Sequence, residues 1–211
     1  MIRSGKTPSD DTVISATRAW VDRAVIGLNL CPFAKGVQVK NQVHYAVSSA
    51  TNPEALLIDL VSELKALVLA DPEIRDDTLL IHPQVLHDFR EFVDFLDIAN
   101  AALDELKLEG VMQIASFHPC YQFEGTQVDD IANYTNRSPY PTLHLLRESS
   151  IDRAVAAFPD AAAIFEQNIA TLRKLGHEGW RRLDVGAPQA APVNRTAQPG
   201  PRTPRSGGRP R

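Results

Sequence analysis

The stretch VMQIASFHPCYQFEGTQVDDIANYTNRSPYPTLHLLRE, residues 111–148, indicates the fold class and concentrates the polar chemistry of the chain. It begins with an apolar run at 111–117, continues through a polar segment and ends in a second apolar run at 142–147. This strand–loop–strand unit holds two histidines, one cysteine, three tyrosines, four acidic residues and two arginines. Functional side chains gather on loops that a rigid scaffold positions, so we expect the functional site here.

Predicted helices and strands alternate on the amino-terminal side of this unit. Apolar residues at steps of three and four predict helices over about 10–30, 53–70 and 86–107. Runs of β-branched or wholly apolar residues predict strands at 36–47 and 78–82. A short helix is expected near 151–157, and a second helix over 164–175 that stops at Gly176. Such alternation requires crossover connections and therefore some parallel pairing, whereas the strand at 142–147 follows a long loop and could be antiparallel. We predict an α/β fold, with α+β as the alternative, in which a mixed sheet of about four strands is layered with helices.

Composition places the chain among ordinary globular proteins with one core. Residues 10–180 are predicted to form a single domain after a flexible leader over residues 1–9. Residues 185–211 are rich in proline, glycine and arginine and are predicted to be a disordered tail. The net charge is −4, but the tail carries five arginines and no acid, which leaves about −9 on residues 1–184. An acidic body argues against specific nucleic-acid binding, although the basic tail could contact nucleic acid weakly.

The two cysteines, Cys31 and Cys120, are too few for a disulfide framework and fit a reducing compartment. The amino-terminal residues lack the apolar core of a signal peptide, and no run of about 18 apolar residues suggests a membrane span. The sequence therefore predicts a cytoplasmic protein without a membrane partner.

Three passages resemble one bacterial family of uncharacterised proteins, named domain of unknown function 1415. They are Ile26–Lys35 (IGLNLCPFAK), Gln113–Pro119 (QIASFHP) and Tyr134–Glu148 (YTNRSPYPTLHLLRE). The resemblance covers roughly residues 17–179 and departs from the family pattern at Cys120, where an acidic residue is expected. It implies family membership and carries no activity or catalytic residue with it.

Two histidines each close an apolar strand and precede a proline, at His82-Pro83 and His118-Pro119. If these strands are parallel, both imidazoles fall at the carboxyl edge of the sheet, where open α/β sheets bind ligands. We predict a site at this edge under the 119–141 loop, with His118 as acid or base and Cys31 as nucleophile or ligand. The alternative is structural, with each imidazole bonded to a backbone carbonyl and the thiol packed under the sheet.

Arg137 is the predicted anion clamp of this site, because a guanidinium fork binds carboxylate or phosphate in a bidentate manner. Its neighbours Asn136 and Ser138 can donate to the same anion. Further predicted substrate contacts come from Tyr134, His82, Arg147 and Lys35. The structural alternative is that these arginines pair with acids and hold their own loop and strand together.

The sequence leaves the class of function open. One prediction is a small-molecule enzyme acting on an anionic substrate, and the other is a non-catalytic module that binds a ligand or a protein. A metal site using Cys31, His118, Cys120 and His144 is a third use of the same residues, although none has the close spacing typical of zinc ligands. No glycine-rich phosphate loop is present, so no nucleotide cofactor is predicted and the cofactor stays unknown.

Overall fold

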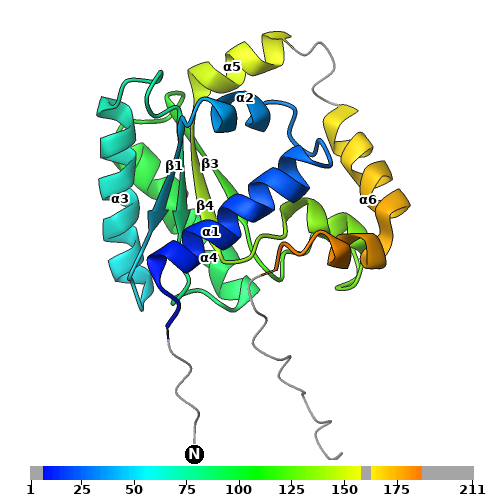
Figure 1. Cartoon of the computed structure of the whole chain (residues 1–211). Helices are drawn as coiled ribbons and strands as arrows, with labels where there is room; N and C mark the ends of the chain where they lie inside the picture. Colours follow the sequence, from blue (N-terminus) through cyan, green and yellow to red (C-terminus); the bar gives the residue numbers. More distant parts are fainter. Residues whose placement is uncertain (1–6, 158–162, 187–211) are drawn as a thin grey trace, which may run out of the picture.

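The computed structural model describes residues 7–157 and 163–186 of the chain. Figure 1 shows a central sheet with helices on both faces. The strands are β1 (Val43–Val47), β2 (Asp77–Ile81), β3 (Met112–Phe117) and β4 (Thr142–Arg147), in the spatial order β1-β2-β4-β3. β1 and β2 are parallel, and β4 runs antiparallel to both of its neighbours, β2 and β3. The predicted α/β fold with a four-stranded mixed sheet is confirmed.

One face of the sheet is covered by α3 (Pro53–Leu69) and α4 (Phe89–Glu105), which enclose the larger part of the core. Both helices begin as their sequences predict, with the side chains of Asn52 and Asp88 accepting hydrogen bonds from backbone N–H groups of the first turn. Four leucines of α3 are fully buried, and burial of each contributes about 1.5–3 kcal/mol. These are Leu56, Leu60, Leu64 and Leu67.

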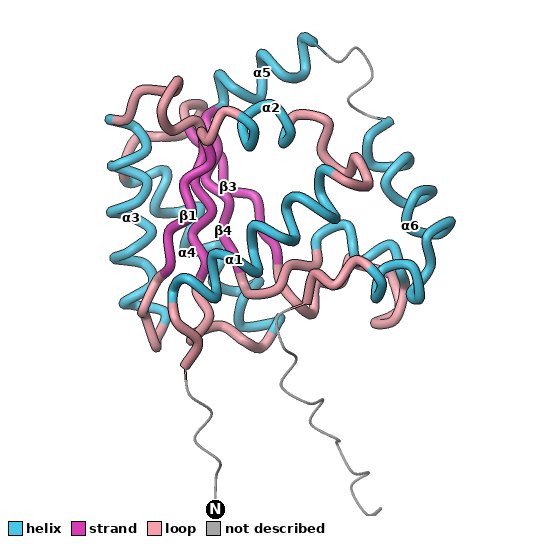
Figure 2. Tube along the Cα trace, in the orientation of Figure 1, coloured by secondary structure: helices cyan, strands magenta, loops and turns pink. Residues whose placement is uncertain are grey.

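The opposite face is covered by the amino-terminal part of the chain, as Figure 2 shows. Helix α1 (Asp10–Trp20) is capped by Ser9, continues into the π-helical turn η1 (Val21–Ile26) and packs against β1. Trp20 is 2% exposed and meets Phe117 of β3 edge to face at 5.1 Å. A second and smaller apolar cluster therefore lies between this layer and the sheet.

The prediction of a strand over 36–47 is wrong for the first half of this range. Its first part forms the short helix α2 (Ala34–Val39), and only the second part is β1. Val37 is half-buried and Val39 is 71% exposed, so these β-branched residues do not belong to a sheet. Asn41, with φ 57°, turns the chain between the two elements.

The predicted 119–141 loop contains a 3-10 helix, η2 (Ile131–Asn136), and leads into β4. Helix α5 (Glu148–Ala157) follows β4 directly, and α6 (Ala163–Arg182) packs against η2. The helix predicted over 164–175 ends at Gly176, whose φ of 66° is not helical, and a second helical segment follows this kink up to Arg182.

The predicted leader over residues 1–9 and tail over residues 185–211 lie largely outside the described residues. Within the described parts of the chain, no helix has both the length and the apolar character needed to cross a bilayer.

Candidate functional site

His82 and His118 follow β2 and β3 at the carboxyl edge of the sheet, as expected, but both are buried, at 0% and 1% exposed. They lie on the α4 side, where Phe92 stacks on His82 at 5.8 Å and contacts His118 at 5.1 Å. Nδ1 of His82 lies 3.2 Å from the carbonyl oxygen of Val85. This is the structural alternative that the sequence analysis left open.

His118 has both ring nitrogens occupied by the backbone. Its Nε2 lies 3.1 Å from the carbonyl oxygen of Leu86, and its Nδ1 accepts a hydrogen bond of 3.0 Å from the N–H of Cys120. The two contacts fit a neutral ring that carries its proton on Nε2. Burial lowers the pKa of His118 to about 4, and burial lowers that of His82 to about 4 as well. No ring nitrogen of His118 is therefore left for substrate in this conformation.

Arg137 holds its own loop together. Its Nε donates to the carbonyl oxygen of Tyr121 at 3.1 Å and an Nη donates to that of Val128 at 2.6 Å. Its guanidinium carbon lies 4.2 Å from the ring centroid of Tyr134. The two neighbours expected to share an anion also bond to backbone, Asn136 to the Ser116 carbonyl and Ser138 to the Tyr140 carbonyl.

Arg147 lies at the end of β4, is 8% exposed and donates hydrogen bonds to the C-terminal end of helix α3. One of its terminal nitrogens donates to the carbonyl oxygens of Leu67 at 2.5 Å, Ala70 at 2.8 Å and Arg75 at 3.3 Å. The first two belong to the last turn and C-cap of α3, where the helix runs out of backbone N–H donors for its last carbonyl groups. The Leu67 carbonyl also accepts from the N–H of Ala70 at 3.2 Å. Burial lowers the pKa of this guanidinium.

The predicted convergence of Cys31, His118 and Arg137 on one hollow is not what the structure has. Only Cys31 lines the large cavity described below, whereas His118 is enclosed on the α4 side and Arg137 is engaged by its loop. Lys35 is exposed on α2 and does not line the cavity. Among the described residues, no group of three or more His, Cys, Asp and Glu side chains could hold a metal ion, so the four donors named for a metal site are not assembled.

A cavity of about 740 Å³ lies on the α1/α2 side of the sheet. Its floor is the sheet, and its walls come from α1, η1, α2 and α5. Most of the lining is apolar. Apolar lining residues include Trp20, Val21, Val37, Leu79, Phe117 and Leu146. A volume of this size is within the range of small-molecule sites.

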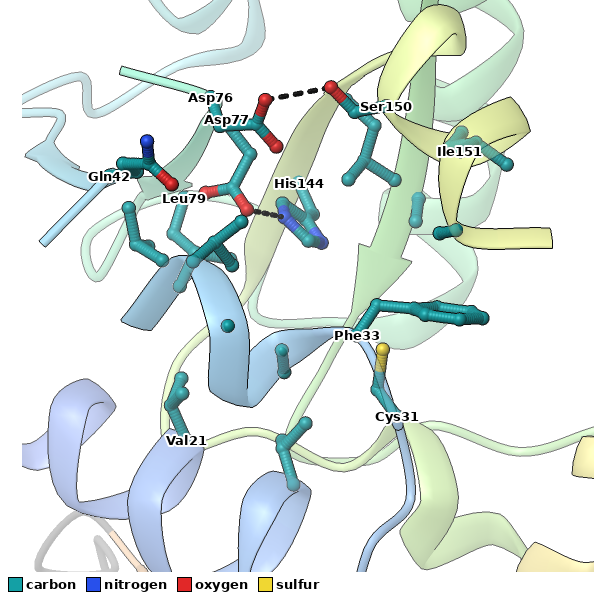
Figure 3. A pocket seen from close by; sticks show the side chains of 18 of the residues that line it. Val21, Cys31, Phe33, Gln42, Asp76, Asp77, Leu79, His144, Ser150 and Ile151 are labelled. Atoms are coloured by element: carbon teal, nitrogen blue, oxygen red, sulfur yellow. Dashed lines mark hydrogen bonds and ion pairs between the residues drawn. The ribbon is translucent and has the colours of Figure 1, made fainter. Parts of the chain in front are cut away.

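A carboxylate and an imidazole face each other on the floor of this cavity, as Figure 3 shows for Asp77 and His144. The register explains the meeting: Asp77 is two residues before Leu79 on β2, and Leu79 pairs with His144 on β4, so all three side chains share one face. Asp77 Oδ2 lies 3.4 Å from His144 Nε2, and the Asp77 side chain is 7% exposed. Among the described residues, neither Asp77 Oδ1 nor His144 Nε2 has a hydrogen-bond partner.

Cys31 lines the same cavity, and in Figure 3 its sulfur points into the pocket from below. Burial raises the pKa of the thiol, while hydrogen bonds from the backbone N–H groups of Phe33 and Ala34 act in the opposite direction. The charge of Asp77 also raises this pKa, because like charges repel across the cavity. The resting group is therefore a thiol, and a base is needed to convert it into a nucleophile.

Sequence reasoning missed Asp77 altogether and considered His144 only as a metal donor. A signal for Asp77 was present, because it directly precedes the apolar run TLLIH at 78–82 and shares the period-two face of Leu79 and Ile81. A carboxylate at a position predicted to be buried needs a partner or a function. His144 stands between Leu143 and Leu145, so it is likewise a polar residue in a strand predicted to be largely buried.

The fold and this site define a mixed α/β domain with a ligand-sized cavity between its sheet and one helical layer. The chain belongs to the family described as protein of unknown function (DUF1415), whose model matches residues 12–182. The comparisons with curated proteins and with solved structures found no match.

Proposed function

We propose that the protein binds a small, largely apolar molecule in the cavity between the sheet and the layer of α1, η1, α2 and α5. The observation that carries this proposal is an apolar hollow of about 740 Å³ that contains buried polar atoms without protein partners. Protein interiors are normally close-packed, and their buried polar groups normally have hydrogen-bond partners. A hollow that also holds unpartnered polar atoms therefore fits a ligand that fills the space and supplies the missing hydrogen bonds.

The three passages that carry the family resemblance support the same location. Each contributes to the lining of the cavity: Cys31 from the first, Phe117 from the second and His144 from the third. These passages are far apart in the sequence, and they meet because β3 and β4 are paired and the chain after η1 returns to the same face of the sheet. The 119–141 loop, where the sequence placed the site, contributes none of the lining residues.

The experiment is a titration with N-phenyl-1-naphthylamine, a neutral apolar dye whose fluorescence increases on leaving water. We expect saturable binding to the native chain. Ala115→Phe, which places a ring in the cavity from β3, should abolish the binding and leave the melting temperature unchanged or higher, because it fills empty space.

The matched control is Ala101→Phe, which adds the same ring at an exposed position on α4, outside the cavity. If Ala115→Phe fails to fold, Val37→Trp blocks the cavity from the α2 side. Binding that survives both filling variants, or its absence from the native chain, would overturn the proposal.

A second candidate is catalysis by the thiol, favoured because Cys31, His144 and Asp77 line one cavity. His144 would take the thiol proton, the Cys31 thiolate would attack an acyl carbonyl, and the alcohol part of an ester would leave. Mass spectrometry after addition of p-nitrophenyl butyrate tests this step. Butyrylation of Cys31 that requires His144 supports it, and labelling that His144→Asn leaves unchanged argues against it.

A further inference from the structure

Three of the polar atoms without partners belong to residues of the cavity. They are Asp77 Oδ1, Trp20 Nε1 and His144 Nε2, of which the last lacks a hydrogen bond but lies 3.4 Å from Asp77 Oδ2. Asp77 is 5% exposed and Trp20 2% exposed, so bulk water does not solvate them freely. Asp77 can only accept hydrogen bonds when ionised, and the indole of Trp20 can only donate. An occupant that completes the site therefore brings a donor to the aspartate, and an acceptor to the indole.

These groups lie at opposite ends of the cavity floor. Asp77 pairs with Leu146 at one end of β4, whereas Trp20 contacts Phe117, which pairs with Thr142 at the other end. Leu146 and Thr142, which mark the two ends, are four residues apart on β4, and this separation corresponds to about 13 Å. The floor between them is apolar apart from His144. An elongated molecule with a polar head at Asp77 fits this distribution.

The charges around Asp77 decide the sign of that head. Asp76 and Glu73 also line this end, and Asp76 is already engaged by the hydroxyl of Ser150 at 2.7 Å and by Arg153 at 3.5 Å. The Arg153 side chain is 65% exposed and directed to Asp76, and Lys40, the lysine of the lining, is exposed at the C-cap of α2. Among the described residues, the ion pair within 4 Å of the Asp77 carboxylate is the one with His144. A carboxylate or phosphate brought here would meet like charge, while a cation would meet a buried acceptor.

Within the proposed binding function, we propose that the ligand is an amphipathic amine, whose ammonium group bonds Asp77 Oδ1 and whose apolar part extends along the sheet toward Trp20. His144 faces Oδ2 and so leaves Oδ1 to the ligand. This inference rests on the proposed function and reverses the charge that the sequence predicted for the substrate.

The test compares three ligands with the same apolar part: 1-octylamine, 1-octanol and octanoate. Binding is followed by the emission of Trp20 in a Trp180→Phe background, which removes the other tryptophan of the chain. Because a hydrogen bond to a charged group is the stronger kind, octylamine should bind at least about tenfold more tightly than octanol. Octanoate should bind more weakly than octanol.

Asp77→Asn should remove the preference for the amine and leave octanol affinity within about threefold, since the apolar contacts persist. The control is Asp97→Asn, at an exposed position on α4 that does not line the cavity, and it should keep the native preference. The comparison of the three ligands uses the Trp180→Phe background alone, so it does not depend on the folding of Asp77→Asn.

The outcomes separate the two proposals. Octylamine binding no better than octanol, or octanoate binding best, overturns the amine and leaves the cavity as a binding site. Failure of all three ligands together with N-phenyl-1-naphthylamine overturns the binding function itself.

Discussion

The two buried histidines should make the protein less stable in mild acid. The pKa of both His82 and His118 is lowered to about 4 by burial, against an ordinary value of 6.5. Between these values the unfolded chain binds protons that the folded chain does not, so the free energy of unfolding falls as the pH is lowered from about 6.5 to 4. Above pH 6.5 both histidines are neutral in the folded and in the unfolded chain, so their protonation no longer lowers the free energy of unfolding.

The size of the effect follows from the shift. At pH 5 each histidine should cost about 2 kcal/mol of stability relative to pH 7.5, and the pair about 4 kcal/mol, from 1.36 kcal/mol per unit of pKa difference. Urea unfolding at the two pH values measures the difference. His118→Gln, whose amide can still donate to the Leu86 carbonyl, should reduce the loss by about 2 kcal/mol.

The matched control is His177→Gln, which removes an exposed imidazole from α6 and should retain the full loss. Histidine Cε1–H resonances give an independent readout. A His118 signal that titrates near pH 6.5, or a stability that is equal at pH 5 and pH 7.5, would refute the assignment of His118 as a neutral, buried and structural residue.

Three further predictions concern the residues that sequence reasoning placed in the site. Arg147→Met should lower the free energy of unfolding by about 3 kcal/mol in urea titrations, because the carbonyls at the end of α3 lose their hydrogen bonds from the guanidinium; an unchanged midpoint would contradict the capping role. Arg137→Ala should increase amide hydrogen exchange in the 121–137 segment while Arg90→Ala, at an exposed position on α4, does not, and equal exchange in both would count against the loop contacts. Iodoacetamide should alkylate exposed Cys120 faster than Cys31, whose thiol is half-buried and has a raised pKa, and a bound cavity ligand should slow Cys31 further; the reverse order of rates would contradict this difference in exposure and pKa.

The layers of the fold were predictable because core formation imposes periods on the sequence. Leu56, Leu60 and Leu64 recur at helical spacing because one face of α3 is buried, and the apolar run of β2 reflects helices on both sides of the sheet. Helix α2 was not predictable in the same way. It is six residues long, too short for a helical period to distinguish it from a strand that contains Val37 and Val39.

The site was less predictable because it depends on which strands become neighbours. His82 and His118 were correctly placed at strand ends, but the sequence does not show which face their imidazoles take or which carbonyls they meet. Asp77 and His144 meet only because β4 inserts between β2 and β3 in an antiparallel register. Cys31 shares their cavity through a tertiary contact of the same kind, with no close spacing in the chain to indicate it.

An amide and methyl NMR titration of the native chain with N-phenyl-1-naphthylamine tests the cavity most directly. Binding as proposed shifts the resonances of lining residues on both walls, such as Val21, Leu79 and Leu146, and leaves those of Leu60 and Phe95 in the α3/α4 core in place. Shifts confined to the core side or to the 119–141 loop, with the lining residues unmoved, would show that the functional site lies elsewhere.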